Sequence, residues 1–478
     1  MGSASAYPSL EWDDSIRLFE LSRSDLPGGR LYGRLTSVRL SNCPEYCAIS
    51  YVWKEPRTKH VVLSKDCTID VPDSLFDGLS EILREREVKL IWADQVCIRQ
   101  ADDHEKESQV VLMAQIYGHA HLVIAWLGKP AEDTRLAFRL LEFFAALPSE
   151  TRGVVEGSEA QRPLLILEEL AQELCLDDRV QVFADPTNAA WRGVFALVKR
   201  PWFTRFWVVQ EVALSSNLSI RCGKFEISGD PFCRVLRLIS MIALFPPPVD
   251  LMNDFNLGLQ LTNLRGSIMV GKSQSFLHLA HRFSHWNCTD DRDRLNALVS
   301  VAFKGNPSPW FSPNYRTDVG GVYQIFAESY ISATGNLDIL HFAGDSRPVV
   351  LPTAGGLQIY NVPYMNDESN VAATWSPDWR IKTRPLPFLS ENSVNDGLAF
   401  SATHSVADFQ LDSSRRRLRV RALLVNEVKV IGPPLLPDCL RSRSQHSKLR
   451  EFSTFGLLWQ DLSVVKMQRM KTGCIDLP

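Results

Sequence analysis

Residues 46–53 read Tyr-Cys-Ala-Ile-Ser-Tyr-Val-Trp, an eight-residue run rich in aromatic and β-branched side chains. Such a run is typical of a buried strand inside a parallel sheet. Three further apolar runs of strand length follow along the chain, near residues 89–93, 121–127 and 218–222. Amphipathic helical patterns lie between them, the first beginning at Pro72. Strands that alternate with helices need crossover connections, so the sequence predicts an α/β fold with a doubly wound parallel sheet.

The chain has 478 residues, a length that suggests about three domains. We assign residues 1–225 to the sheet domain, with a mostly helical insertion at 131–200 that should project beside the third strand. A polar stretch at 149–162 motivates the insertion. Residues 226–345 have mainly helical patterns. Residues 346–478, rich in Pro and Ser with short alternating stretches, predict a small β-rich C-terminal region.

The composition excludes several classes of protein. Lys and Arg total 52 against 55 for Asp and Glu, so no basic excess supports nucleic-acid binding. No apolar run approaches the roughly 20 residues of a membrane span, and the N-terminus lacks the pattern of a signal peptide. The ten cysteines include no Cys-x-x-Cys pair, which favours a reduced, cytoplasmic protein. Walker A, GxGxxG and GxSxG motifs are absent from the sequence.

Polar and aromatic side chains follow the predicted strands at the edge where open parallel sheets bind ligands. Trp53 ends the first strand, Asp94 and Gln95 follow the second, and Glu211 lies on the helix before the fourth. We expect Glu211 to share one pocket with Trp53, Asp94 and Trp207, and this pocket suits a polar small molecule. The structural alternative is that Asp94 caps the next turn while Trp53 packs under a loop.

Trp207 and Glu211 stand four residues apart, so a helix places both on one face. An indole beside a carboxylate removes water from it and raises its pKa, which suits acid–base chemistry or stabilisation of an oxocarbenium ion. The alternative is structural: Trp207 belongs to the core and Glu211 pairs with Arg205 or Arg200.

Two other clusters have weaker functional interpretations. The spacing of His278, His281, His285 and Cys288 spreads them over roughly 15 Å of one helix, so only adjacent members could share a metal and we expect no metal site. The basic run Arg415–Arg421 places alternate arginines on one strand face, which is by default a solvated face. A contact with phosphate or an acidic partner is the alternative.

The chain resembles fungal heterokaryon-incompatibility (HET) domain proteins in three blocks. The first is residues 46–53, and the second runs from Leu90 through Asp94 and Gln95 to Gly128. The third is Arg200-Pro-Trp-Phe203 followed by Arg205, Trp207-Val-Val-Gln-Glu-Val212 and Cys222-Gly223. Segments similar to those of longer family members follow at 289–293, 313–315 and 375–379. The sequence departs from the family pattern at four positions, which are Lys54, Arg99, Lys106 and Asp291.

HET domains are thought to be distant relatives of Toll/interleukin-receptor (TIR) domains, so the resemblance implies a TIR-like doubly wound sheet. TIR enzymes that cleave NAD carry a glutamate in a Trp-x-x-x-Glu segment, which matches Trp207 and Glu211 here. The resemblance therefore implies Glu211 as the catalytic residue, stabilising an oxocarbenium-like transition state through the ribose hydroxyls. Trp53, Asp94, Gln95, Arg205 and Trp207 would bind the substrate. NAD would be a substrate and no cofactor is expected.

Two functions follow from this resemblance. The first is an effector of non-self recognition and programmed cell death that hydrolyses NAD at the nicotinamide–ribose bond. The second is a non-enzymatic TIR-like module that oligomerises and recruits partners. Under both we expect self-association and contacts with other incompatibility or signalling proteins.

Overall fold

The structure is a computed structural model that describes residues 7–23, 31–53, 57, 59–64, 67–84, 90–146, 189–242, 249–343, 346–353, 356–363, 373, 375–380, 409–413, 417–424 and 471–477. Lys54, residues 147–188 of the expected insertion and most of the expected C-terminal region lie outside these residues. So do Arg415 and Arg416 of the basic run.

The described part of the chain contains a nine-stranded sheet with the order β5-β4-β2-β1-β6-β3-β7-β8-β9. The strands are β1 (Ser15–Arg23), β2 (Leu31–Arg39), β3 (Cys47–Ser50), β4 (Lys59–Ser64), β5 (Cys67–Val71), β6 (Leu90–Trp92), β7 (Leu122–Trp126), β8 (Leu218–Cys222) and β9 (Phe225–Ser228). The four strands expected from the apolar runs are β3, β6, β7 and β8. Neighbours among them all pair in parallel, which confirms the predicted α/β centre.

The flanks of the sheet correct the expectation of an all-parallel sheet. β1 pairs antiparallel with both β2 and β6, and β4–β5 and β8–β9 are antiparallel hairpins. A short connection imposes this direction on the β8–β9 hairpin, since only two residues, Gly223 and Lys224, join its strands. Gly223 has a φ of 55°, which a side chain would disfavour. The sheet is therefore mixed, with a parallel centre.

The order in which the parallel strands are added to the sheet reverses between β3 and β7. Strand β3 comes first in the chain, β6 is added on one side, and β7 and then β8 are added on the other. Numbered by chain position, the order is 2-1-3-4, which is a doubly wound arrangement. The crevice where such sheets bind ligands lies beyond the carboxyl ends of the first and third strands, here the ends of β3 and β7.

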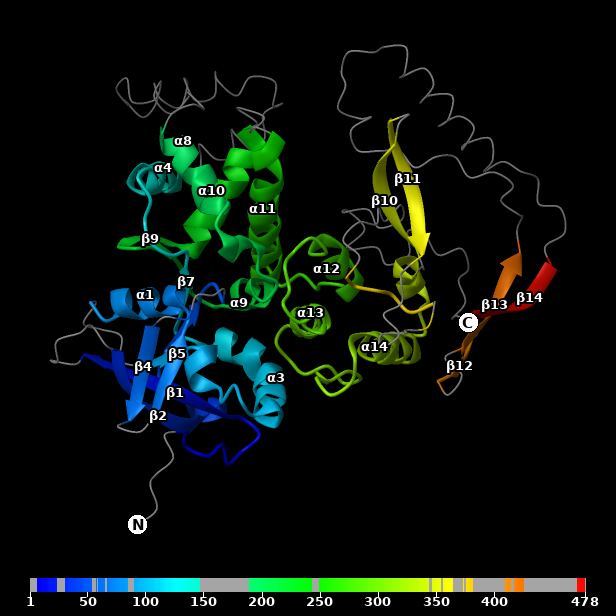
Figure 1. The fold of residues 1–478 in the computed structure, drawn as a ribbon, viewed down its shortest axis with the longest axis horizontal. Helices are drawn as coiled ribbons and strands as arrows, with labels where there is room; N and C mark the ends of the chain where they lie inside the picture. The colour runs from blue at the N-terminus through cyan, green and yellow to red at the C-terminus, as the bar shows by residue number, and fades with distance from the viewer. Residues whose placement is uncertain are drawn as a thin grey trace.

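Helices cover the sheet and extend beyond it. They are α1 (Asp73–Ile82), α2 (Asp94–Cys97), α3 (Asp103–His119), α4 (Thr134–Ala146), α8 (Ala189–Val198), the 3₁₀ helix η2 (Pro201–Thr204), α9 (Val208–Ala213), α10 (Gly229–Ile242), α11 (Val249–Met269), α12 (Phe276–Arg282), α13 (Asp293–Ala302) and α14 (Val319–Thr334). The Asp102 carboxylate caps α3 by accepting from the amides of His104 and Glu105, as the sequence predicts. Figure 1 shows α4, α8, α10 and α11 gathered near β9, while α12, α13 and α14 lie beyond α9 and α3.

Helices α4 and α8, at the two ends of the expected insertion, pack against each other. Helix α10 and helices α11–α14 lie within residues 226–345, where the sequence predicts mainly helix. Farther on, β10 (Ser346–Thr353) pairs with β11 (Gly356–Pro363), and β12 (Phe409–Asp412), β13 (Arg417–Leu424) and β14 (Lys471–Leu477) form a three-stranded sheet. On β13, Arg417 and Arg419 are exposed while Leu418 and Val420 are buried, in the expected alternation.

No helix among the described residues is long and apolar enough to cross a membrane.

Candidate functional site

The site is built at the carboxyl end of β3. Tyr51 follows the last residue of this strand and donates its hydroxyl to Oδ1 of Asp94 at 2.5 Å. Trp53 donates its indole N–H to Oδ2 of the same carboxylate at 2.7 Å. Asp94 is the first residue of α2, directly after β6, and β6 pairs in parallel with β3. Because the two strands end at the same edge, Trp53 and Asp94 meet as the strand positions predict.

Asp94 is only 7% exposed, and burial raises its pKa. Three donors oppose this shift: the Tyr51 hydroxyl, the Trp53 indole and the backbone amide of Gln95, which lies 2.7 Å from Oδ1. The charge of Arg205 also lowers the pKa. The N-cap of α2 is Ala93, so the Asp94 side chain binds the Tyr51–Trp53 segment and its own helix turn rather than acting as an N-cap.

Gln95 is also buried at this edge. Its amide nitrogen lies 3.5 Å from the Asp70 carbonyl oxygen, and no donor reaches its Oε1 within the described residues. The side chain therefore faces β5 as well as α2.

Glu211, on α9, lies over the end of β3. The Ser50 hydroxyl donates to Oε2 of Glu211 and accepts the indole N–H of Trp202 at 2.7 Å. Nη2 of Arg205 lies 3.6 Å from Oε1 of Glu211, while Nη1 donates to the Tyr51 carbonyl. The Arg205 guanidinium also lies 5.9 Å from the centre of the Tyr51 ring. Arg205 thus links the Glu211 carboxylate to the segment that binds Asp94.

The Glu211 side chain is fully buried, and burial raises its pKa. The charge of Arg205 and the Ser50 hydrogen bond lower the pKa, and the negative charge of Asp94 raises it further. Within the described residues Oε1 accepts no hydrogen bond, although it is inaccessible to water. Both features that the sequence suggested for Glu211 are present: the carboxylate pairs with Arg205, and burial removes water from it. Its Oε1 therefore has an ion-pair partner but no hydrogen-bond donor among the described residues.

Trp207 has a different partner. Its backbone carbonyl accepts the Glu211 amide at 3.1 Å, but its indole N–H donates to Oδ2 of Asp293 on α13 at 3.0 Å. The structure therefore links Trp53, Asp94, Arg205 and Glu211 by side-chain contacts through Tyr51, whereas the polar edge of Trp207 is turned to another helix.

Sequence reasoning missed Ser50, Tyr51 and Trp202. Ser50 carries the available signal, because it is the one Ser or Thr in the apolar run 46–53 and a buried hydroxyl requires a hydrogen-bond partner. Trp202 stands in the Arg-Pro-Trp-Phe block, where its indole N–H marks it as more than an apolar core residue.

Gln210, beside Glu211, is 1% exposed, and neither polar atom of its amide has a partner in the described part of the chain. We expect Gln210→Met to raise the free energy of unfolding by about 1 kcal/mol, because an unpaired buried amide loses its hydration without compensation. Urea unfolding measures this difference. Gln324→Met is the matched control, since the buried amide of Gln324 donates to Glu328 at 2.8 Å and its removal should give no gain. A less stable Gln210→Met protein would contradict the prediction.

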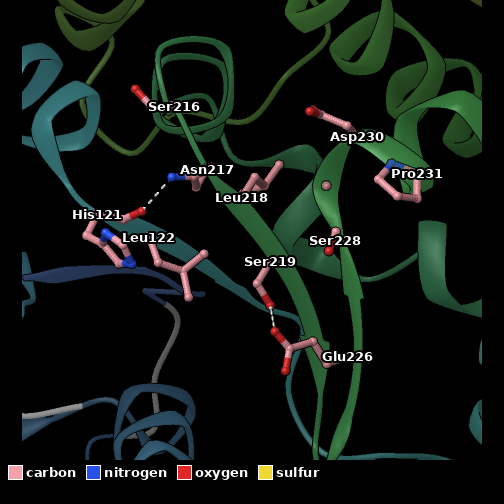
Figure 2. A pocket seen from close by; sticks show the side chains of 11 residues that line it. His121, Leu122, Ser216, Asn217, Leu218, Ser219, Glu226, Ser228, Asp230 and Pro231 are labelled. Atoms are coloured by element: carbon pink, nitrogen blue, oxygen red, sulfur yellow. Dashed lines mark hydrogen bonds between the residues drawn. The ribbon is translucent and has the colours of Figure 1, made fainter. Parts of the chain in front are cut away.

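A pocket of about 380 Å³ lies at the amino ends of the parallel strands β7 and β8, opposite the edge that holds Glu211. Figure 2 shows its wall at the beginnings of β7 and β8, where Asn217 donates to the His121 carbonyl at 2.9 Å and Ser219 to Glu226 at 2.6 Å. Ligands of open parallel sheets bind beyond the carboxyl ends of the strands, and this pocket lies at the amino ends of β7 and β8. We therefore place the candidate site at Glu211. Among the described residues, no group of three His, Cys, Asp or Glu side chains could hold a metal ion.

Residues 46–211 match the family model described as heterokaryon incompatibility protein (HET). The match begins one residue before β3 and ends at Glu211, so it contains all the residues that meet at the site. This part of the chain is thus similar to HET domains. The chain is 28% identical over 252 residues to heterokaryon incompatibility protein 6, OR allele, of Neurospora crassa. The aligned part covers 48% of this chain and 36% of that relative, so the chain spans about a third of its length. No solved structure matches the chain.

Proposed function

We propose that this protein acts in heterokaryon incompatibility as an effector of non-self recognition and programmed cell death, and that its HET domain hydrolyses NAD at the nicotinamide–ribose bond. The family match and the Neurospora relative support the incompatibility role. The observation that carries the chemistry is the buried Glu211 carboxylate, which has an unsatisfied oxygen at the edge where the doubly wound sheet binds ligands.

The proposed reaction breaks the bond between C1′ of the ribose and the nicotinamide nitrogen. The bonding electrons leave with nicotinamide, which becomes neutral, and positive charge develops on the ribose ring. Ionised Glu211, accepting hydrogen bonds from the ribose hydroxyls, would stabilise this charge in a site from which water is largely excluded. A water molecule then adds to C1′ and releases one proton, so that ADP-ribose and nicotinamide are the products.

The other residues have separate roles in this proposal. Ser50, which accepts the Trp202 indole N–H, holds Oε2 of Glu211, so that Oε1 is the oxygen proposed to meet the substrate. Arg205 opposes the rise that burial causes in the pKa of Glu211 and so favours the ionised carboxylate, and Trp53, held by Asp94, offers an aromatic face to a nucleotide base or nicotinamide ring. Glu211 and Asp94 are buried, so substrate reaches them only when the partly exposed side chains of Trp53 and Arg205 move.

One observation favours a second function. The ion pair between Arg205 and Glu211 closes the site, and a closed pair also suits a structural role in a non-enzymatic TIR-like module that self-associates and recruits signalling partners. A direct assay separates the two functions. The purified full chain is incubated with NAD, at low and high protein concentration and after cross-linking, and nicotinamide is quantified by chromatography. Release that rises with protein concentration supports the hydrolase. Cross-linked oligomers that release no nicotinamide would exclude it and support the module.

A further inference from the structure

We propose that Asp293, which lies outside the HET match, is a positioning residue that holds the segment Thr204–Glu211 of the HET domain against α13. The proposal goes beyond the function above, because it concerns how the segment bearing Arg205 and Glu211 is placed, whatever reaction or partner the site serves.

The Asp293 carboxylate joins three parts of the chain. It is the first residue of α13 and 9% exposed. Oδ2 accepts the indole N–H of Trp207 at 3.0 Å. Oδ1 accepts the Tyr315 hydroxyl and lies 3.4 Å from the amide nitrogen of Asn296, which also donates to the Tyr315 oxygen at 3.0 Å. Three donors on a buried carboxylate define its position closely.

Two further contacts hold the same segment. The Asn287 backbone donates to the Thr204 carbonyl at 2.6 Å and accepts the Phe206 amide at 2.9 Å. On α13, the guanidinium of Arg294 lies 5.4 Å from the Phe206 ring centre and pairs with Asp291 at 3.0 Å. Residues 287–294, which follow the HET match, therefore contact residues 204–207 through both backbone and side-chain groups.

These contacts help to position the residues of the candidate site. Arg205 is inside the held segment, and Trp207 is the N-cap of α9, which bears Glu211. Helix α9 has only six residues, too few for a helix to be stable without tertiary packing. Loss of the Asp293 contact should therefore loosen α9 and the Glu211–Arg205 pair together.

The surroundings of Asp293 make its contact depend on pH. Burial raises its pKa to about 6, the negative charge of Asp290 adds to this, and the hydrogen bonds from Tyr315, Trp207 and Asn296 oppose it. Arg292 pairs with Asp290 and lies over the Tyr315 ring, and Glu107 on α3 accepts the Tyr315 amide. Other titratable or charged groups on helices α3, α9 and α12 and in the loop before α13 include Lys106, Glu211, His278, His281, Arg282 and Cys288.

The direction of this pH dependence follows from the pKa of Asp293 in the closed and in the opened interface. Asp293 binds a proton more tightly in the closed interface, where its pKa is about 6, than in an opened one, where the ordinary value is 3.8. The proton therefore favours the closed interface below pH 4, and this stabilisation is lost as the pH rises to about 6. The two values give an increase of about tenfold in the population of the opened segment between pH 5 and pH 7.

Hydrogen exchange of the full chain, read by mass spectrometry on peptides covering residues 204–214, tests the proposal. After correction for the intrinsic rate, wild-type exchange should become about tenfold faster from pH 5 to pH 7, relative to peptides from β7. Asp293→Asn should abolish this pH dependence, and Asp293→Ala should speed exchange at least tenfold at both pH values. The control Asp103→Asn removes an exposed carboxylate on α3 and should behave as wild type.

Wild-type exchange in this segment that does not change with pH, or unchanged protection in Asp293→Ala, would overturn the proposal. Neither readout uses NAD, so a failure here is distinct from a failure of the proposed hydrolase.

Discussion

Glu211→Gln is expected to lower nicotinamide release from NAD by about 10³-fold or more while the protein stays folded. Gln has the same shape as Glu and still accepts the Ser50 hydroxyl, so the hydrogen bond from Ser50 is kept. What it lacks is the negative charge, and stabilisation of developing positive charge on the ribose depends on that charge. The measurement is the initial rate of nicotinamide release, with circular dichroism and thermal unfolding to verify the fold.

The same variant should abolish cell killing if killing depends on NAD loss. The matched control is Glu20→Gln, which removes a half-exposed carboxylate on β1 that pairs with Arg34 on β2 and should leave both activities unchanged. A Glu211→Gln protein that kills at the wild-type level would eliminate the hydrolase and leave the recruitment module as the function of the domain.

The sequence predicts the parallel centre of the sheet well, because its signal is local. Residues 46–53, 89–93, 121–127 and 218–222 are apolar runs between helical patterns, and each contains a strand of the structure. The antiparallel pairing of β1 with β2 and β6 was not predicted, since the partner of a strand depends on tertiary contacts. Nothing in the alternating run around Ile16–Leu21 indicates that β1 lies between β2 and β6.

In the candidate site, too, local signals could be predicted from the sequence and tertiary contacts could not. Trp53 and Asp94 could be brought together from sequence because each follows a strand, and parallel neighbours end at one edge. The direction of the Trp207 indole could not be predicted. Four-residue spacing places Trp207 beside Glu211 on a helix, but the neighbour that accepts the indole N–H, Asp293, is 86 residues away. Ser50 was counted as part of a strand, although its hydroxyl is the one that holds Glu211.

Arg205→Met is expected to lower the free energy of unfolding by about 3 kcal/mol at pH 7.5, because it leaves the buried Glu211 carboxylate without its cation. Burial already raises the pKa of Glu211, and Arg205 lowers it, so the substitution raises it further. A group whose pKa is raised on folding loses stability as the pH rises, and the loss in Arg205→Met should therefore be smaller at pH 5 than at pH 7.5. Urea unfolding at the two pH values measures both effects.

A second substitution shows whether the charge itself is responsible. In Arg205→Met/Glu211→Gln no buried charge remains at this position, so most of the lost stability should return and its pH dependence should disappear. Arg34→Met, which breaks the exposed pair with Glu20, should cost less than about 1 kcal/mol at either pH, because solvent screens that pair. A double variant as unstable as Arg205→Met would mean that Arg205 acts through its contacts with Tyr51 rather than by neutralising Glu211. In that case Arg205 would be a structural residue of the β3 edge, and the ionised state that the proposed chemistry needs would have to come from Ser50 and from the substrate.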